Sequence, residues 1–132
     1  MALTKTARTL VAAGTTQTAG LTNFQRGILD MNAVQGTSTL TLKITNGATG
    51  PTTQCTGRVL IAHNTTLPAA ASEGADWKTL YPPVGPGTAN SASLVSAYRI
   101  DPSVMCLEVE FTGNTGQDVT VEAYLSEFTT VA

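Results

Sequence analysis

The sequence predicts an all-β protein, built as a two-sheet antiparallel sandwich of the jelly-roll type with about eight strands and an extended N-terminal arm. Several short segments alternate apolar and polar residues with period 2, which is typical of half-buried strands. Clusters of Gly, Pro, Asn and Asp separate these segments, and no segment shows a convincing helical period. An immunoglobulin-like sandwich is the alternative, but the chain lacks the Cys…Trp…Cys spacing of that fold.

Residues 1–27 are predicted to form the N-terminal arm or an edge segment, and residues 28–132 to form the sandwich domain. The stretch TARTLVAAG indicates a short strand, whereas TTQTAGLTNFQRG has no period. A frayed terminus is the alternative for this region. If it is an arm, removing residues 1–12 should leave the domain folded.

Three segments in the first half of the domain predict strands. ILDMNAV, residues 28–34, is expected to be an edge strand. STLTLKITNG, residues 38–47, places Leu40, Leu42 and Ile44 on one face and threonines on the other. CTGRVLIAHN, residues 55–64, is apolar on both faces, which indicates a central strand or one covered by a neighbour.

Residues 64–93 form a long region rich in proline and without a clear period. Loops of this length are uncommon unless they bind or cover something. Within it, DWKTLYP predicts a short strand with Trp77 and Tyr81 on one face. SLVSAYRIDP, residues 93–102, predicts the next strand, which Asp101-Pro102 ends.

The stretch LEVEFTGNTGQDVTVEAYL, residues 107–125, predicts a β-hairpin with Gly116 in a left-handed conformation. This register places Glu108 opposite Glu122, an unfavourable pair unless a cation such as Lys43 or Arg58 lies nearby. The final SEFTTVA is predicted to be a tail that packs on the domain through Phe128.

Composition excludes several classes of function. The 132 residues suit one domain, 42% are hydrophobic and only 12% are charged. Seven scattered basic residues and a net charge of −2 argue against nucleic acid as a partner. No apolar run approaches the ~20 residues of a membrane span, and the start lacks the apolar stretch of a signal peptide, so we expect synthesis in the cytoplasm.

The chemistry-bearing residues do not form a recognisable active site. Glu108, Glu110 and Glu122 alternate with core residues and are predicted to face solvent; a catalytic pair would have to line a deep cleft. His63 has no nucleophile motif to serve, and no metal-binding, phosphate-binding or cofactor motif is present. Cys55 and Cys106 are predicted to be small buried thiols rather than a disulfide.

Five stretches of the chain together resemble small virion structural proteins of tailed bacteriophages, and most of all a capsid cement, or decoration, protein with a jelly-roll fold. They are MALTKTARTLVAAGTTQTAG, LTLKITNGATGPT, GRVLIAHN, EGADWKTLYP and VMCLEVEFTGNTGQDVTVEAYLSE, and they span most of the chain. The resemblance implies no enzymatic activity and no cofactor. It also implies copies arranged at symmetry points on the capsid, commonly as dimers or trimers.

Resemblance and composition together predict a non-enzymatic viral structural protein that binds and stabilises the capsid surface by bridging subunits of the major capsid protein. About two dozen threonines and few charges favour this, because such a surface is covered by another protein at little desolvation cost. The expected partners are the major capsid protein and further copies of this chain, without nucleic acid, membrane, metal or cofactor. The expected location is the capsid surface of the virion, after synthesis in the bacterial cytoplasm.

Two groups of residues are predicted to make these contacts. An arm can add a strand to the sheet of a neighbour, and interface aromatics often carry binding energy. The predicted contact residues are Leu3, Thr9, Leu10 and Val11 in the arm, and Trp77, Leu80 and Tyr81 in a patch.

Two alternatives remain open from the sequence. One is another virion location, such as the neck, the tail or the fibre base. The other is a carbohydrate-binding sandwich module, in which Trp77, Tyr81 and Tyr98 would form an exposed platform for a sugar ring.

Overall fold

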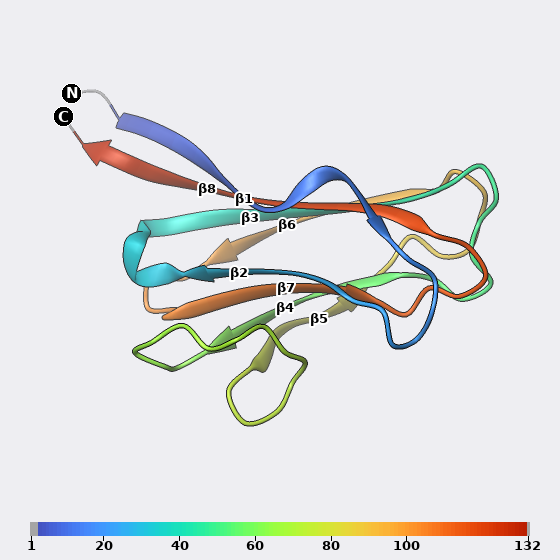
Figure 1. Ribbon diagram of the computed structural model, residues 1–132. Coiled ribbons are helices and arrows are strands. Elements are labelled where there is room, and N and C mark those ends of the chain that lie inside the picture. The colour runs from blue at the N-terminus through green and yellow to red at the C-terminus, as the bar shows by residue number, and fades with distance from the viewer. Residues whose placement is uncertain (1–2, 132) are drawn as a thin grey trace.

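Eight strands form two four-stranded antiparallel sheets that lie face to face, one above the other in Figure 1. The computed structural model describes the backbone of residues 3–131, and the side chains in that range except those of residues 3, 35 and 129–131. The strands are β1 (Leu3–Gln17), β2 (Gln25–Asp30), β3 (Gln35–Asn46), β4 (Thr56–Ala62), β5 (Lys78–Val84), β6 (Ser93–Ile100), β7 (Cys106–Thr112) and β8 (Val119–Val131). A 3-10 turn, η1 (Met31–Ala33), follows β2.

The connectivity is that of a jelly roll. The upper sheet has the order β1-β8-β3-β6, and the lower sheet has the order β2-β7-β4-β5. Because β1 pairs with β8, β2 with β7, β3 with β6 and β4 with β5, the chain resembles one long hairpin rolled into a sandwich. The predicted all-β sandwich of eight strands is confirmed.

The main core lies between the two sheets and follows the alternation in the sequence. Leu40, Leu42 and Ile44 of β3 are fully buried, as their spacing predicts. β4 is a central strand between β7 and β5, and its Val59 also lies in this core. The central position explains why β4 is apolar on both faces.

The predicted hairpin of residues 107–125 is wrong, because β7 and β8 belong to different sheets. β7 pairs with β2 and β4, so Glu108 lies opposite Ile28 and Leu60 rather than Glu122. The local pattern of two strands and a turn is the same for a hairpin and for a crossing between sheets. Gly116 does adopt the predicted left-handed conformation, with φ of 84°.

The buried Asn114 anchors this crossing between sheets. Its Nδ2 donates to the backbone oxygens of Gln17 and Gln117, at 3.1 and 3.0 Å. These bonds satisfy the backbone carbonyl at the end of β1 and one within the crossing segment itself.

The N-terminal segment is part of the upper sheet. Residues 3–17 form its edge strand β1, paired with β8, and the predicted boundary after residue 27 falls inside β2. Val11 is buried in the main core and Leu10 packs against it. Deleting residues 1–12 would therefore remove most of a strand of the sheet, contrary to the expectation of a dispensable arm.

The remaining predicted strands are present with adjusted ends. β2 stops at Asp30, whose carboxylate accepts from the Asn32 backbone N–H at 3.0 Å and caps η1, so the predicted strand 28–34 is too long. β6 spans the predicted segment, whereas the predicted tail is the second half of β8. No helix among residues 3–131 has the length and apolarity needed to cross a bilayer.

Candidate functional site

The outer face of the lower sheet is covered by residues 63–77, which we call the covering loop (below the lower sheet in Figure 1). Leu60, Ala62 and Cys106 point to this face and form a second hydrophobic cluster with Trp77. Trp77 is 1% exposed, and its Nε1 donates to the Ala69 carbonyl at 2.8 Å. The prediction that this long segment covers something is confirmed: it covers its own sheet.

Glu110 of β7 joins the covering loop to two neighbouring strands. Its Oε2 accepts from Ser72 Oγ of the loop at 2.8 Å and from Arg26 Nη2 of β2 at 3.0 Å. Its Oε1 accepts from Arg58 Nε of β4 at 3.0 Å. Two guanidinium groups thus neutralise a carboxylate that is only 2% exposed.

Glu108 lies two residues earlier on the same face and is fully buried. Its Oε1 accepts from the Ala71 backbone N–H at 3.0 Å and lies 3.5 Å from Arg26 Nε. Its Oε2 has no hydrogen-bond partner among the described residues. Burial raises the pKa of Glu108 to about 7, while the Arg26 guanidinium opposes the shift, so the carboxyl titrates near neutral pH.

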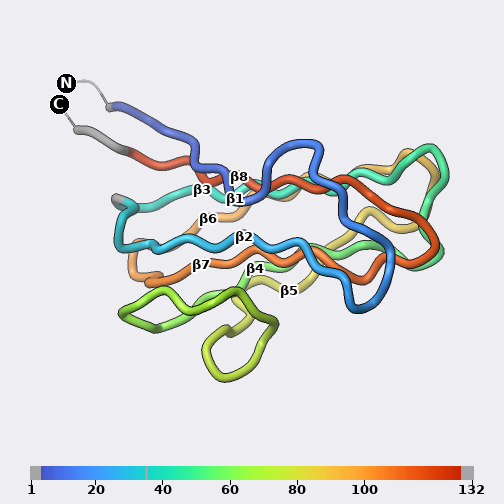
Figure 2. The backbone as a smooth tube through the Cα atoms, in the orientation of Figure 1, coloured from blue at the N-terminus to red at the C-terminus, as the bar shows by residue number. Residues whose placement is uncertain are grey.

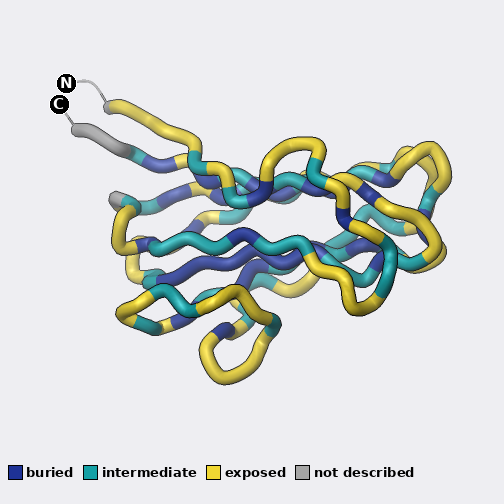
Figure 3. Tube along the Cα trace, viewed as in Figure 1, coloured by how far each residue is buried: buried dark blue, intermediate teal, exposed yellow. Residues whose placement is uncertain are grey.

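The prediction that Glu108 and Glu110 face solvent is therefore wrong. β7 is buried along nearly its whole length, as the dark blue of Figure 3 shows, because the covering loop closes over its outer face. Both carboxylates fasten this loop, and Glu110 is held between two arginines. Glu122 differs: it is half-buried on the upper sheet and lies opposite Lys43.

The other chemistry-bearing residues stay apart. Among residues 3–131, no three His, Cys, Asp or Glu side chains are grouped so as to hold a metal ion. His63 is exposed at the start of the covering loop. Cys55 lies in the main core and Cys106 in the second cluster, both as free buried thiols. Burial raises the pKa of Cys55 to about 12, which keeps its thiol protonated and unreactive.

The outer face of the upper sheet, which we call the open face, has no covering segment in Figures 1 and 2. Its side chains are those that alternate with the core residues of the four strands. Nearly half of them are threonine or serine, and four are charged. They are Lys5, Ala7 and Thr9 of β1; Thr120, Glu122, Tyr124, Ser126 and Phe128 of β8; Thr37, Thr39, Thr41, Lys43 and Thr45 of β3; and Ser93, Val95, Ala97 and Arg99 of β6.

A bulge in β1 rises above one part of the open face. The pairing with β8 shifts between Val11 and Thr15, so residues 12–14 arch away from the sheet (the raised blue segment in Figure 2). The arch is held down because the Ala13 backbone N–H donates to Tyr124 Oη at 2.9 Å. The open face is thus a broad surface with one raised edge.

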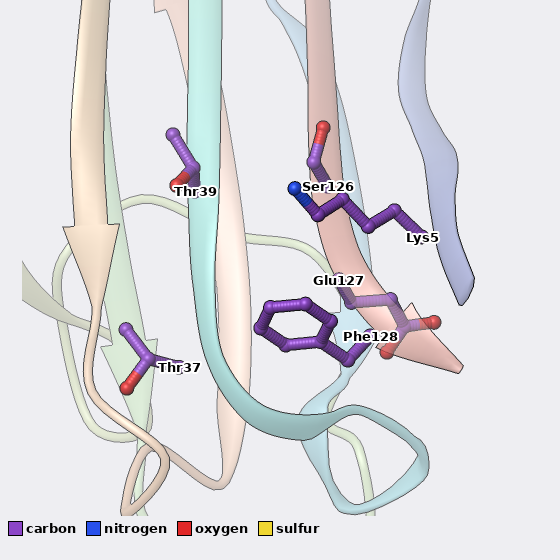
Figure 4. A pocket seen from close by; sticks show the side chains of 6 residues that line it. All are labelled: Lys5, Thr37, Thr39, Ser126, Glu127 and Phe128. Atoms are coloured by element: carbon purple, nitrogen blue, oxygen red, sulfur yellow. The ribbon is translucent and has the colours of Figure 1, made fainter. Parts of the chain in front are cut away.

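A shallow hollow of about 220 Å³ lies at one end of the open face (Figure 4). The Phe128 ring contributes its apolar wall, with Lys5 Nζ 5.8 Å from the ring centroid. Hydroxyl groups of Thr37, Thr39 and Ser126 complete it, together with the buried Glu127. Neither this hollow nor a second one beside Thr45 and Asp118 is lined by Glu108 or Glu110.

The two groups of predicted contact residues lie at opposite sides of the sandwich. The backbone of Leu3 pairs with Val131 at the free end of β1. Further along the same strand, Thr9 is exposed and Val11 is buried. Leu80 is 36% exposed on β5, at the far edge of the other sheet. The two groups therefore do not form one patch.

The predicted aromatic surface does not exist in the structure. Trp77 is buried in the second cluster and offers no surface to a partner or a sugar, so its assignment as a contact residue is wrong. Tyr81 packs against the main core and stacks on Tyr98, with ring centroids 4.5 Å apart. The pairing of β5 with β4 shifts between these positions, so Trp77 and Tyr81 do not share a face.

Sequence reasoning missed the threonine-rich open face as the candidate site. The signal was present: Thr39, Thr41 and Thr45 were expected on the outer side of their strand. What the alternation does not show is that one sheet keeps this side uncovered while the other does not. The ion-pair network of Arg26, Glu110 and Arg58 was also missed, because alternation does not show that a loop covers this face.

Comparison with known proteins supports the fold alone. No protein-family model and no curated protein matches the chain. Among solved structures, infectious bursal disease virus Gx strain aligns with a TM-score of 0.50 and 8% identity, over 96% of this chain and 32% of that chain. The xylan-binding domain from CBM 22 aligns with a TM-score of 0.48 and 13% identity, over 97% of this chain and 89% of that one.

A further similar structure comes from a prophage. The SPBc2 prophage-derived protein YomS aligns with a TM-score of 0.44 and 15% identity, over 96% of each chain. The structures similar to this chain thus include viral, prophage-derived and carbohydrate-binding proteins.

Proposed function

We propose that this chain is a non-enzymatic structural protein of a bacteriophage virion, which binds the capsid surface and stabilises it by bridging subunits of the major capsid protein. The observation that carries the proposal is the open face, a broad sheet surface rich in hydroxyl groups and poor in charge. We propose the major capsid protein as the partner because the sequence resembles capsid cement proteins. A protein that binds only the assembled shell stabilises that shell by mass action.

The physical properties of the open face suit such a contact. Threonine side chains present methyl and hydroxyl groups on a rigid β-surface, so a partner covers them without stripping water from many ions. The raised segment 12–14 and the hollow beside Phe128 give the face a shape that a partner can match. Since Thr9 of β1 lies on the same face, one of the predicted contact residues falls within the proposed interface.

The proposal involves no catalytic step. The buried carboxylates fasten the covering loop, and Glu110 is neutralised by two arginines. The carbohydrate-binding alternative needs an exposed aromatic platform, which the burial of Trp77 and the stacking of Tyr81 on Tyr98 remove.

The test combines particle composition with two matched variants. Virions from the phage or prophage that encodes this chain are purified and their proteins identified by mass spectrometry, and we expect the chain among them. Capsids lacking the chain are then mixed with Thr39→Arg/Thr120→Arg, which places two charges on the open face, and cosedimentation should drop at limiting protein concentration.

The control variant places two arginines on the covering loop, at the other side of the sandwich. Thr66→Arg/Ala70→Arg changes two exposed residues of the covering loop and should bind capsids like the unchanged protein. Absence of the chain from purified virions would refute the proposed function, and equal binding by both double variants would refute the open face as the interface.

A further inference from the structure

The two sheets have four edge strands, and three of them are protected against pairing with another chain. β1 carries three register shifts, and Gly14 in its bulge has φ of 79°. β2 has only six residues, and its Gly27 lies against the Leu10 backbone of β1, where an added Cβ would be 2.4 Å from the Leu10 oxygen. β5 contains Pro82 and Pro83, which have no backbone N–H. Bulges, short length and proline are the usual means of preventing edge-to-edge association.

The fourth edge, β6, has none of these features. It pairs with β3 without a register shift from Ser93 to Ile100, and no described strand pairs with its other side. Its residues include no proline and one charged side chain, Arg99, at its end. Val95, in the middle of the strand, is 61% exposed. Such a regular edge, with a single charged side chain near its end, is a template for strand addition.

We propose that β6 is a self-association edge, at which two copies of this chain pair antiparallel across a two-fold axis near Ser96. This deepens the proposed function by naming how copies meet, and it rests on that function only for its biological setting. The pairing would join two upper sheets into one eight-stranded sheet. The two open faces would then form one continuous surface twice as wide.

A second copy suits this edge because its own side chains are complementary across the axis. With Ser96 opposite itself, Val95 lies opposite Ala97 and Arg99 lies opposite Ser93. The exposed Val95 is thereby covered by a small apolar residue, and no like charges face each other. An isologous contact needs this self-complementarity.

The neighbouring edge of the lower sheet adds area on the same side of the sandwich. β5 pairs Tyr81 with Val59 and Thr79 with Leu60, which leaves Leu80 as the extra residue of a bulge. Leu80 and Val95 are two of the four exposed large hydrophobic residues found in the described part of the chain. The hydroxyl of Tyr81 donates to the Arg99 carbonyl at 2.8 Å, so this one backbone acceptor near the end of the β6 edge already has a partner from β5.

The experiment measures the mass of the full chain by sedimentation equilibrium up to about 100 µM, a range that detects micromolar association. The wild-type chain should approach the dimer mass. Val95→Lys/Ala97→Lys and Val95→Glu/Ala97→Glu should each weaken association about tenfold or more, because like charges then face each other at a desolvated edge. An equimolar mixture of the two variants should recover the dimer.

The matched control is Ala7→Lys/Thr9→Lys, which places two lysines at the same spacing on the opposite edge of the same sheet. It should associate like the wild type. A wild-type chain that stays monomeric, or charge variants that associate as strongly as the control, would overturn the proposal. Because the assay uses no capsid, such a failure would leave the proposed binding to the virion untouched.

Discussion

The outer faces of the two sheets are built from similar alternating strands, but the face of the upper sheet is exposed and the face of the lower sheet is covered. On the upper sheet, half of the alternate residues of β3 and β8 are threonines, and no loop closes over this sheet in Figure 1 as the covering loop does over the lower one. On the lower sheet, the alternate residues of β7 and β4 include Glu108, Glu110 and Arg58, and these are shielded by the covering loop. Charged residues that alternate with core residues can therefore be internal, and uncharged threonines can form the exposed surface.

The comparison separates a stabilising face from a binding face. The covered face has a hydrophobic cluster, a buried tryptophan and carboxylates with hydrogen-bond partners, so substitutions there should affect folding. The open face lacks such contacts, so substitutions there should affect association. The four predictions that follow test this division, in order of decreasing effect.

Trp77→Ala should lower the free energy of unfolding by about 3–5 kcal/mol, the usual cost of removing a large buried aromatic side chain. Trp77 fills the space between the covering loop and the sheet, so its loss should also free the loop. Urea unfolding measures the free energy, and limited proteolysis within residues 63–77 measures the loop. Thr39→Val on the open face is the control and should cost less than about 0.5 kcal/mol; equal costs would contradict the division.

Stability should fall as pH rises through the range set by Glu108. The pKa of its carboxyl is raised from 4.5 to about 7 by burial, so the folded state keeps a proton that the unfolded state has already released. The stabilisation from the proton on Glu108 is complete below pH 4.5 and is lost as pH rises through about 7. The total loss in the free energy of unfolding is up to roughly 3 kcal/mol. Chemical denaturation at a series of pH values measures this loss.

Glu108→Gln provides the comparison, because the amide resembles the protonated carboxyl and does not titrate. The difference in stability between wild type and variant should shift in favour of the variant from pH 5 to pH 8. Glu73 and Asp101 act in the opposite direction, since hydrogen bonds lower the pKa of both carboxyls, and they contribute equally to both proteins. A pH-independent difference would refute the assignment of the titration to Glu108.

Lys43→Glu should destabilise the protein by about 0.2–1 kcal/mol, because it places a second carboxylate opposite Glu122 on the open face. Adding Glu122→Lys should restore most of the loss by reversing the pair. Thermal or urea unfolding of the two single variants and the double variant gives the coupling between them. Additive effects would mean that the two side chains do not interact across the strands.

Thr39→Val should change the free energy of unfolding by less than about 0.5 kcal/mol, the smallest effect in the series. The residue is exposed, and valine keeps the β-branched shape while removing the hydroxyl. A urea unfolding curve that overlays the wild type would confirm this. A loss above about 1 kcal/mol would show that the open face contributes to folding as well as to binding.

Sequence reasoning was most successful where burial follows from alternation within one strand. Leu40, Leu42 and Ile44 were assigned to the core by period 2, and the apolar pattern of β4 predicted its central, covered position. The same reasoning failed at β7 and β8, because a turn of Gly and Asn residues permits both a hairpin and a crossing between sheets. It also failed at Glu108 and Glu110, since alternation assigns a side chain to a face without saying what lies over that face.

The sequence alone determined that this chain is an all-β sandwich with about eight strands and a threonine-rich exterior, because strand periodicity and composition are local properties. Only the tertiary structure decided which outer face is covered, that Glu108 and Glu110 are buried with Glu110 held between two arginines, and that β6 is the unprotected edge. These features depend on contacts between residues far apart in the chain, such as Ser72 with Glu110. Such contacts depend on how the sheets and loops pack, and the residue pattern within a single strand does not predict them.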